Sequence, residues 1–504
     1  MIEAALKKNW KWFVCYMLMY ICIYGPLCMR FGLTVEDAKM VPTSTIWLAN
    51  GRWLVQIVRE IFGHSAHQPV SCLMAGCFIS LAIMLQTSIF GLNRRWQKIL
   101  YGIVYLSCLQ WAFIVKYACM CDGVALALLA CSVSAYCLAQ PPSVKNTTVA
   151  TLCACLGMAG YQTGAFYLGA LLILMIMHKI ICREGFHQIR QFSIRAFTAC
   201  IAGLVMYLIV MKLCKLLVPQ DVMDFATDYQ NRMISWGSYK SMSLNDCIIN
   251  YIHWAVVIPL RNILGKGYYL QWIYSTGLVA IMAIFLKSVS GRRYAAAVLL
   301  AALGIICMYL PECMTALMPN GWASQGVRLK LAEPVVLAGL WGLFLYQLPA
   351  ATGGWMRCLC CLGLFLFVKA SYKGAMMARD EAYYFNAQMN EMRAMYTLAC
   401  VEARLANLNS FEVIICGRLK NPPYDHMFPI NEYGYYLDEP LPYCFSRKSR
   451  IKWFSIYARL PHFRAAEMEE ETKYQQKLSN MPSWPKQGCI QIGDSNQILL
   501  KIGD

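Results

Sequence analysis

Apolar stretches of about 20 residues recur through the first three quarters of the chain, and short polar segments separate them. Each stretch is long enough to cross the hydrocarbon core of a bilayer as a helix. Backbone polar groups in hydrocarbon need internal partners, so such segments are helical. The pattern predicts an α-helical polytopic membrane protein with about 11 transmembrane helices, over residues 11–28, 69–91, 99–117, 122–140, 147–162, 163–182, 195–217, 268–287, 294–311, 331–349 and 354–371.

Basic residues gather in the connections on one side of these predicted helices. Lys7 and Lys8 precede the first helix, and Arg94 and Arg95 follow the second. Cytoplasmic loops of membrane proteins carry an excess of Lys and Arg. The pattern predicts a multi-pass protein of the cell (plasma) membrane with a cytoplasmic N-terminus. The basic loops fall on one side only if the segment 248–264 does not cross the membrane, so we expect an interfacial or re-entrant helix there.

The charge of the chain has the same explanation. Of 504 residues only 14% are charged, where a soluble protein carries about 25%, and the net charge is +18. From Ser371 onward there are 16 basic and 15 acidic residues, so the excess lies in the apolar part. Membrane topology therefore explains the positive net charge, and no nucleic-acid partner is expected.

The polar tail reads as a separate region. Helical periodicity covers Arg379 to Asn409, an apolar β-type run follows at 410–416, and two apolar runs flank Asp494-Ser495-Asn496 as in a hairpin. We predict two domains, a transmembrane domain at 1–370 and a small C-terminal α/β extracytoplasmic domain at 371–504. Whether Cys416 and Cys489 form a disulfide in this domain stays open.

Two adjacent carboxylates, Glu36 and Asp37, fall in the first predicted outer loop. Transfer of a sugar to a hydroxyl needs a base that takes the proton of the acceptor. A carboxylate at the membrane surface serves a donor whose lipid tail stays in the bilayer. The alternative is an ordinary solvated loop.

Two arginines and a tryptophan lie near the same predicted outer face of the membrane, and they suit a sugar donor that carries a phosphate. A guanidinium at Arg52 or Arg328 binds phosphate with two parallel hydrogen bonds. Trp53 either stacks on a sugar or anchors the chain at the interface. Arg328 falls on the predicted outer side, where the positive-inside rule leaves few basic residues. For both arginines a plain interfacial or solvated role stays open.

Three further polar residues lie at predicted outer helix ends. Asp122 begins a membrane helix, where an acid is either functional or stabilises the helix dipole. Tyr161 and Gln162 lie in a predicted outer turn, where Gln162 binds a sugar hydroxyl or packs helices together. All three are candidates for substrate binding.

Nucleotide-binding signatures are missing from the sequence. We find no phosphate-cradling loop and no dinucleotide fingerprint, and no nucleotide cofactor is expected. A divalent metal ion at Glu36 stays possible, and the metal ligands are unknown.

These residues together resemble the bacterial type II membrane glucosyltransferases, which modify O-antigen and belong to the GT-C superfamily. The resemblance rests on Glu36-Asp37, Gly51-Arg52-Trp53, Asp122, Gly160-Tyr161-Gln162 and Arg328. Family members often carry two aspartates where this chain has Glu36-Asp37. The resemblance implies a GT-C-like fold, a polyprenyl-phosphate-linked hexose donor, most simply glucose, and a surface polysaccharide acceptor.

The resulting hypothesis is a glycosyltransferase that acts on the outer face of the membrane. Asp37 is the candidate general base, and Glu36 supports it or binds metal. Arg52 and Arg328 are the candidates for donor phosphate binding, with Asp122, Tyr161, Gln162 and Trp53 as substrate contacts. The alternatives are a lipid-linked glycan flippase or transporter, although no internal repeat is found, and a non-catalytic assembly protein.

Overall fold

The protein is seen in a computed structural model that describes most of the chain. The described residues are 2–28, 45–62, 68–108, 110–115, 120–220, 222–224, 226–227, 243–252, 268–291, 293–316, 331–348, 390–417, 462–494 and 496–502, with single positions between 365 and 372. Internal contacts divide the chain into two compact units, one made of Met1–Phe31 and Ser44–Ala378 and the other of Gly32–Thr43 and Arg379–Asp504. Each is described by itself below.

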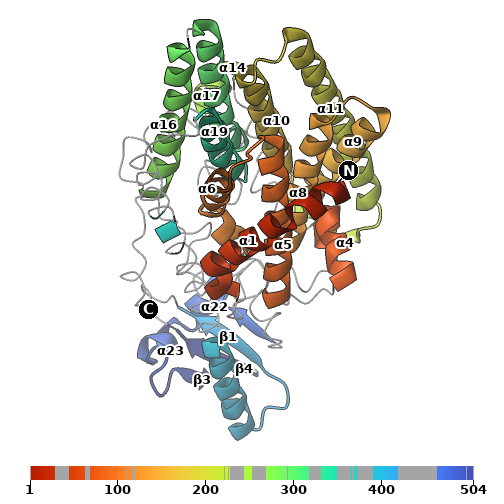
Figure 1. The fold of residues 1–504 in the computed structure, drawn as a ribbon. Helices are drawn as coiled ribbons and strands as arrows, with labels where there is room; N and C mark the ends of the chain where they lie inside the picture. Colours follow the sequence, from red (N-terminus) through yellow and green to blue (C-terminus); the bar gives the residue numbers. More distant parts are fainter. Residues whose placement is uncertain are drawn as a thin grey trace. The chain divides into compact units, whose positions relative to one another are not determined.

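The first unit is a bundle of helices (Figure 1). Its described helices are α1 (Ile2–Cys28), α3 (Ile46–Ala49), α4 (Trp53–Phe62), α5 (Gln68–Ile89), α6 (Arg95–Leu106), α7 (Gln110–Val115), α8 (Cys121–Ala139), α9 (Val144–Gly160), α10 (Gly164–Ile181), α11 (Phe186–Lys215), α14 (Leu244–Ile252), α16 (Tyr268–Ser290), α17 (Tyr294–Ala316) and α19 (Glu333–Gln347).

Several of these helices have the length and composition of membrane spans. Within the described residues five qualify, namely parts of α1, α5, α8, α10 and α11, and shorter apolar stretches lie in α16 and α17. The protein is therefore a helical membrane protein. The full number of spans stays a prediction, and most of the predicted span at 354–371 lies outside the described residues.

One predicted span is wrong as a continuous helix. The apolar run 99–117 breaks after Leu106, and α7 starts only at Gln110. Carbonyl groups near the break find donors elsewhere, since the Tyr24 hydroxyl donates to the carbonyls of Leu106 (2.6 Å) and Cys108 (3.2 Å). Trp111 Nε1 likewise donates to the Tyr105 carbonyl at 2.7 Å. The hydropathy pattern does not show the break because these donors come from aromatic residues that also count as apolar.

A fully buried polar network joins four helices inside the bundle. Gln86 Nε2 of α5 donates to Ser132 Oγ of α8 (2.9 Å) and to the Tyr167 hydroxyl of α10 (2.6 Å). The hydroxyls of Tyr101 and Tyr105 on α6 bond to Gln86 Oε1 and to the Tyr167 hydroxyl. Each polar group has a partner, which is what an apolar interior requires.

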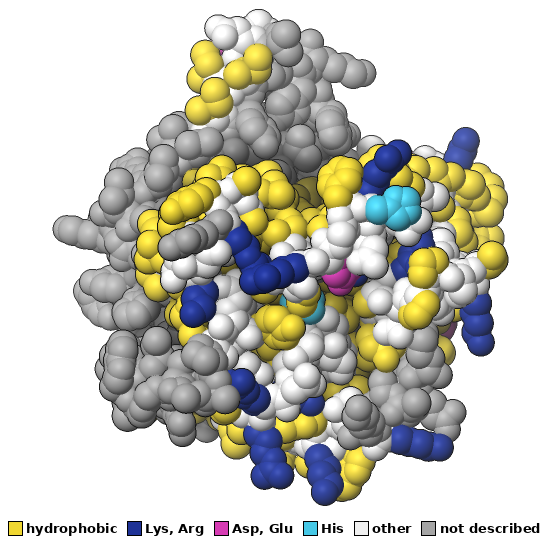
Figure 2. Space-filling view, turned by 45° about the horizontal axis from the view of Figure 1, so that its top comes forward, with side chains coloured by type: hydrophobic (Ala, Val, Ile, Leu, Met, Phe, Trp, Pro, Cys, Tyr) yellow, Lys and Arg dark blue, Asp and Glu magenta, His cyan; other side chains and the backbone are white. Residues whose placement is uncertain are grey.

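Basic side chains spread over the end of the bundle where α10 turns into α11 (Figure 2). Two arginines, Arg94 and Arg195, donate to carbonyl groups at helix ends. Arg94 Nη1 bonds to the Leu348 carbonyl after α19 at 3.3 Å. Arg195 of α11 bonds to the carbonyls of Leu138 and Gln140 at the end of α8.

The second unit is built on a four-stranded sheet of order β2-β1-β4-β3. Strands β1 (Glu412–Cys416), β2 (Phe463–Ala465) and β4 (Gln497–Lys501) are parallel, and β3 (Ile490–Ile492) pairs antiparallel with β4. The last two are the arms of the predicted hairpin. The helix within 390–405 packs on one face, and α22 (Met468–Lys473) with α23 (Gln475–Asn480) packs on the other.

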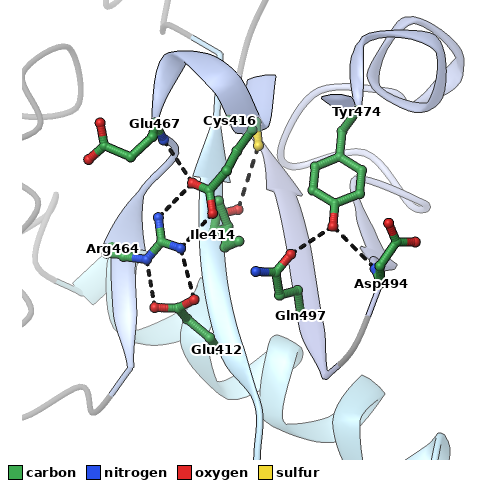
Figure 3. Close-up of polar contacts among 9 residues, drawn as sticks. Glu412, Ile414, Cys416, Arg464, Glu467, Tyr474, Asp494 and Gln497 are labelled. Atoms are coloured by element: carbon green, nitrogen blue, oxygen red, sulfur yellow. Dashed lines mark hydrogen bonds and ion pairs between the residues drawn. The ribbon is translucent and has the colours of Figure 1, made fainter. Parts of the chain in front are cut away.

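An arginine between two glutamates fastens α22 to this sheet (Figure 3). Arg464 of β2 donates to both carboxylate oxygens of Glu412 on β1, at 2.6 and 2.9 Å, and to both of Glu470 on α22, at 2.7 and 2.6 Å. Such bidentate pairs fix orientation as well as charge.

The possible disulfide in the tail is not formed, because Cys416 and Cys489 are both free thiols. Cys416 is in register with Lys501 on one side of β4, and the Cys489 carbonyl accepts from the Lys501 amide on the other side. With strands spaced about 4.8 Å apart, the two cysteines are separated by about twice that spacing. A disulfide needs α-carbons about 4.4–6.8 Å apart, so the sheet keeps them from pairing.

Candidate functional site

A tight turn between α3 and α4 carries Arg52. Gly51 in this turn has a φ of +73°, a left-handed conformation that glycine adopts without strain. The backbone amide of Arg52 donates to the Trp47 carbonyl at 2.7 Å, and its carbonyl accepts the Gln56 amide as α4 begins. The turn thus fixes Arg52 at the N-terminal end of α4.

Aromatic rings surround the Arg52 guanidinium. Its carbon lies 4.4 Å from the ring centroid of Tyr161 and 5.8 Å from that of Trp47. Both distances are within the range of cation–π attraction. Arg52 Nη1 also approaches the Met120 thioether at 3.9 Å. None of these partners is an anion.

One glutamine side chain ties Arg52 to the turn between α9 and α10. Gln162 Oε1 accepts from Arg52 Nε at 3.5 Å, and Gln162 Nε2 donates to the Asn50 carbonyl at 2.6 Å. The predicted residues Arg52, Tyr161 and Gln162 are therefore brought together, although 110 positions separate the first from the last. Among the described residues Arg52 has no carboxylate partner.

Asp122 has a different environment, although it belongs to the same end of the bundle. Its carboxylate forms an ion pair with Arg59 of α4, and the two side chains are only 1% and 3% exposed. The second oxygen accepts from the Gly123 amide at 2.8 Å, and Arg59 Nη1 reaches Ser71 Oγ at 3.5 Å. Both carboxylate oxygens of Asp122 are thus engaged within the protein.

Close packing of α4 on α8 holds this ion pair in place. A Cβ atom on Gly123 would meet Val55 Cγ2 at 2.9 Å and Val55 Cα at 3.0 Å. Only glycine lets the two helices approach so closely. Because α4 is held against α8, Arg59 reaches Asp122.

Trp53, the remaining described candidate, begins α4 and is partly buried against a small apolar cluster that includes Leu54 and Tyr207. Its ring is therefore packed in the protein. Glu36, Asp37 and Arg328 lie outside the described residues. Their roles remain predictions from the sequence.

Three buried residues of the bundle were not predicted from the sequence. Arg59 lies on the buried, otherwise apolar face of α4. An arginine at such a position predicts a buried charge that needs an acidic partner. Tyr207 gave no signal, since it is one aromatic residue within the apolar α11. Glu333 is buried at the start of α19 and accepts a hydrogen bond from Gln110 Nε2. An acid at the start of an apolar helix could also have been recognised from the sequence.

Metal ligation finds no support in the part of the chain that the structure describes. No group of three or more His, Cys, Asp or Glu side chains there is placed to hold a metal ion. The possible metal at Glu36 concerns residues outside the described ranges.

Fold and site together define the class of protein. It is a helical membrane protein with a partly buried arginine, surrounded by aromatic rings and an amide, that suits an anionic ligand. The family model of glucosyl transferase GtrII matches residues 33–326, more than half of the chain. The chain belongs to this family, which confirms the resemblance expected from the sequence and implies a glucosyltransferase. No curated protein and no solved structure matches the chain.

Proposed function

We propose that the protein is a GT-C-type enzyme that transfers glucose from a polyprenyl-phosphate-linked donor to a surface glycan on the outer face of the plasma membrane. The observation that carries the proposal is the pairing of charges along α4. Arg59 is neutralised by Asp122, whereas the partners of Arg52 among the described residues are all neutral. A guanidinium whose described neighbours include no counterion is suited to bind a phosphate.

The matched family segment contains most of the candidate residues. Residues 33–326 include Glu36, Asp37, Arg52 and the Tyr161-Gln162 pair. Arg328 lies just beyond the match. The membrane spans support a donor whose lipid tail stays in the bilayer, and the basic residues at the opposite end support an outward-facing site.

Each group has a defined part in the proposed reaction. The acceptor hydroxyl forms a bond to the anomeric carbon of glucose and gives its proton to Asp37 as general base, with Glu36 in support. The bond between that carbon and the phosphate oxygen breaks, and polyprenyl phosphate leaves with one more negative charge. Arg52, joined by Arg328, stabilises that charge, as preorganised cations do.

Purified protein in nanodiscs tests the proposal. It receives radiolabelled polyprenyl-phosphate glucose and a crude surface-glycan acceptor, and label in the glycan is measured for wild type and for Asp37→Asn. Transfer by wild type alone supports the reaction and the base. Full activity of Asp37→Asn removes Asp37 from the mechanism. Movement of the lipid across vesicles without transfer favours a transporter.

Exposed Arg95, at the opposite end of the bundle, supplies the matched control. Arg95→Gln removes the same charge far from the proposed site, so it should transfer glucose at the wild-type rate. Equal losses in Arg95→Gln and Arg52→Gln would show that the assay responds to general damage and not to phosphate binding.

A further inference from the structure

Buried polar atoms without partners concentrate around α4. Five such side-chain atoms among the described residues belong to α4, to the turn before α10 or to α11: Trp53 Nε1, Gln56 Oε1, Arg59 Nε, Thr163 Oγ1 and Tyr207 Oη. Native proteins leave few buried polar atoms unpaired, and each requires an explanation. Their concentration beside Arg52 points to a ligand that supplies the missing partners.

Three of these groups belong to residues that are neighbours of the Arg52 site in the chain or in space. Trp53 follows Arg52 in the chain, Thr163 follows Gln162, and the Tyr207 hydroxyl lies beside the turn at Gly51. Tyr207 of α11 is 5% exposed and packs with Leu54 in one apolar cluster. All three groups are hydrogen-bond donors.

The Tyr207 hydroxyl lies at the turn that carries Arg52. A Cβ atom on Gly51 would stand 2.8 Å from this hydroxyl and 2.9 Å from Met211 Sδ, so the absence of a side chain at position 51 is what admits Tyr207. The close approach positions a buried donor beside the cation. The Gln162 side chain lies beside this hydroxyl, but no described residue accepts its proton with the geometry of a hydrogen bond.

We infer that Tyr207 is a ligand-binding residue whose hydroxyl donates a hydrogen bond to an oxygen of the lipid-linked glucosyl phosphate. The inference rests on the proposed function and adds α11 to the donor site. Sugar hydroxyls and phosphate oxygens are the acceptors that a neutral donor beside a guanidinium would fit.

Binding by the full-length protein in nanodiscs tests this assignment. Dissociation constants are measured for a short-chain polyprenyl-phosphate glucose with wild type and with Tyr207→Phe, which removes only the hydroxyl. We expect about tenfold weaker binding by the variant, equivalent to about 1.4 kcal/mol. Equal binding by both proteins overturns the assignment of Tyr207 and leaves the proposed function intact. A wild type that binds no such lipid overturns both.

Tyr167→Phe is the matched control for a merely structural role. The Tyr167 hydroxyl is bonded to Gln86 and Tyr105 inside the bundle, so its removal leaves buried groups unpaired and should lower the melting temperature. Tyr207→Phe removes a hydroxyl that has no hydrogen-bond acceptor in the described part of the chain, and it should melt no lower than wild type. A fall as large as that of Tyr167→Phe would show an internal partner and overturn the inference.

Discussion

Arg52 and Arg59 stand seven residues apart at α4, about two helical turns, yet among the described residues only Arg59 is paired with a carboxylate. Arg52 lies just before α4 begins, and Arg59 lies in its last turns. Arg59 holds α4 to α8, whereas Arg52 is the arginine that the proposed function assigns to the donor phosphate.

The first prediction concerns Arg52. Arg52→Gln should raise the KM for the lipid-linked donor roughly tenfold to hundredfold, because a hydrogen bond to a charged group contributes about 1.5–3 kcal/mol. Arg52→Lys should recover part of this loss, since it keeps the charge without the planar fork. Steady-state kinetics at saturating acceptor measure the effect, and an unchanged KM in Arg52→Gln would refute the role.

The second prediction concerns the buried ion pair. Arg59→Met or Asp122→Leu alone should destabilise the protein by about 3–5 kcal/mol, because each leaves an unpaired charge in the interior. The double variant should recover most of that loss, since no buried charge remains. Thermal melting of the four proteins gives the coupling, and additive losses would show that the two charges do not interact.

Activity of the same double variant separates structure from chemistry. If the pair only holds α4 in place, the folded double variant should transfer glucose at a rate near that of wild type. A folded but inactive double variant would instead make Asp122 a substrate contact, as the sequence suggested.

The third prediction uses the turn at Gly51. Gly51→Ala forces a residue with a side chain to a φ of +73° and drives its Cβ atom into the Tyr207 hydroxyl. Backbone strain of this kind costs about 1–3 kcal/mol. We expect a lower melting temperature and weaker donor binding together. Gly185→Ala is the control, because a Cβ atom there meets nothing within 4 Å; if it behaved like Gly51→Ala, the geometry of the turn would not be the cause.

The fourth prediction concerns a buried thiol in the second unit. Burial raises the pKa of Cys416 from an ordinary 9.0 to about 12. The folded state thus favours the neutral thiol, and this stabilisation is complete below pH 9 and is lost as pH rises from about 9 to about 12. Alkylation of Cys416 by iodoacetamide, followed site by site with mass spectrometry, should stay slow until that interval. Rapid alkylation at pH 8 would contradict the burial.

Hydropathy predicted a helical membrane protein because an apolar run of about twenty residues has the length of a membrane span, and a span needs its backbone hydrogen bonds satisfied within a helix. It failed at Ser107–Cys108, where the helix breaks and the Tyr24 hydroxyl, from α1, donates to the carbonyl of Cys108. The hairpin at β3 and β4 was readable for the opposite reason, since a turn and its two strands are local.

The candidate site was predictable in its residue types and only partly in its geometry. Arg52 and Gln162 were chosen separately, from a loop and a turn, and the structure joins them. Asp122 was chosen as an acid at membrane depth, but its partner Arg59 was not foreseen because pairing across 63 positions leaves no local pattern. The roles of Glu36, Asp37 and Arg328 still rest on the sequence.

The approach of Tyr207 to Gly51 also sets an order of events during synthesis. The ribosome produces Arg52 long before Tyr207, and at about 5–20 residues per second the interval is roughly 8–30 s. Throughout that interval α11 has not entered the bilayer, and the turn at Gly51 has no neighbour on that side. A nascent chain that is released early would therefore carry the arginine without its neighbouring hydroxyl. The contact between the turn at Gly51 and α11 therefore joins two segments that the ribosome makes many seconds apart.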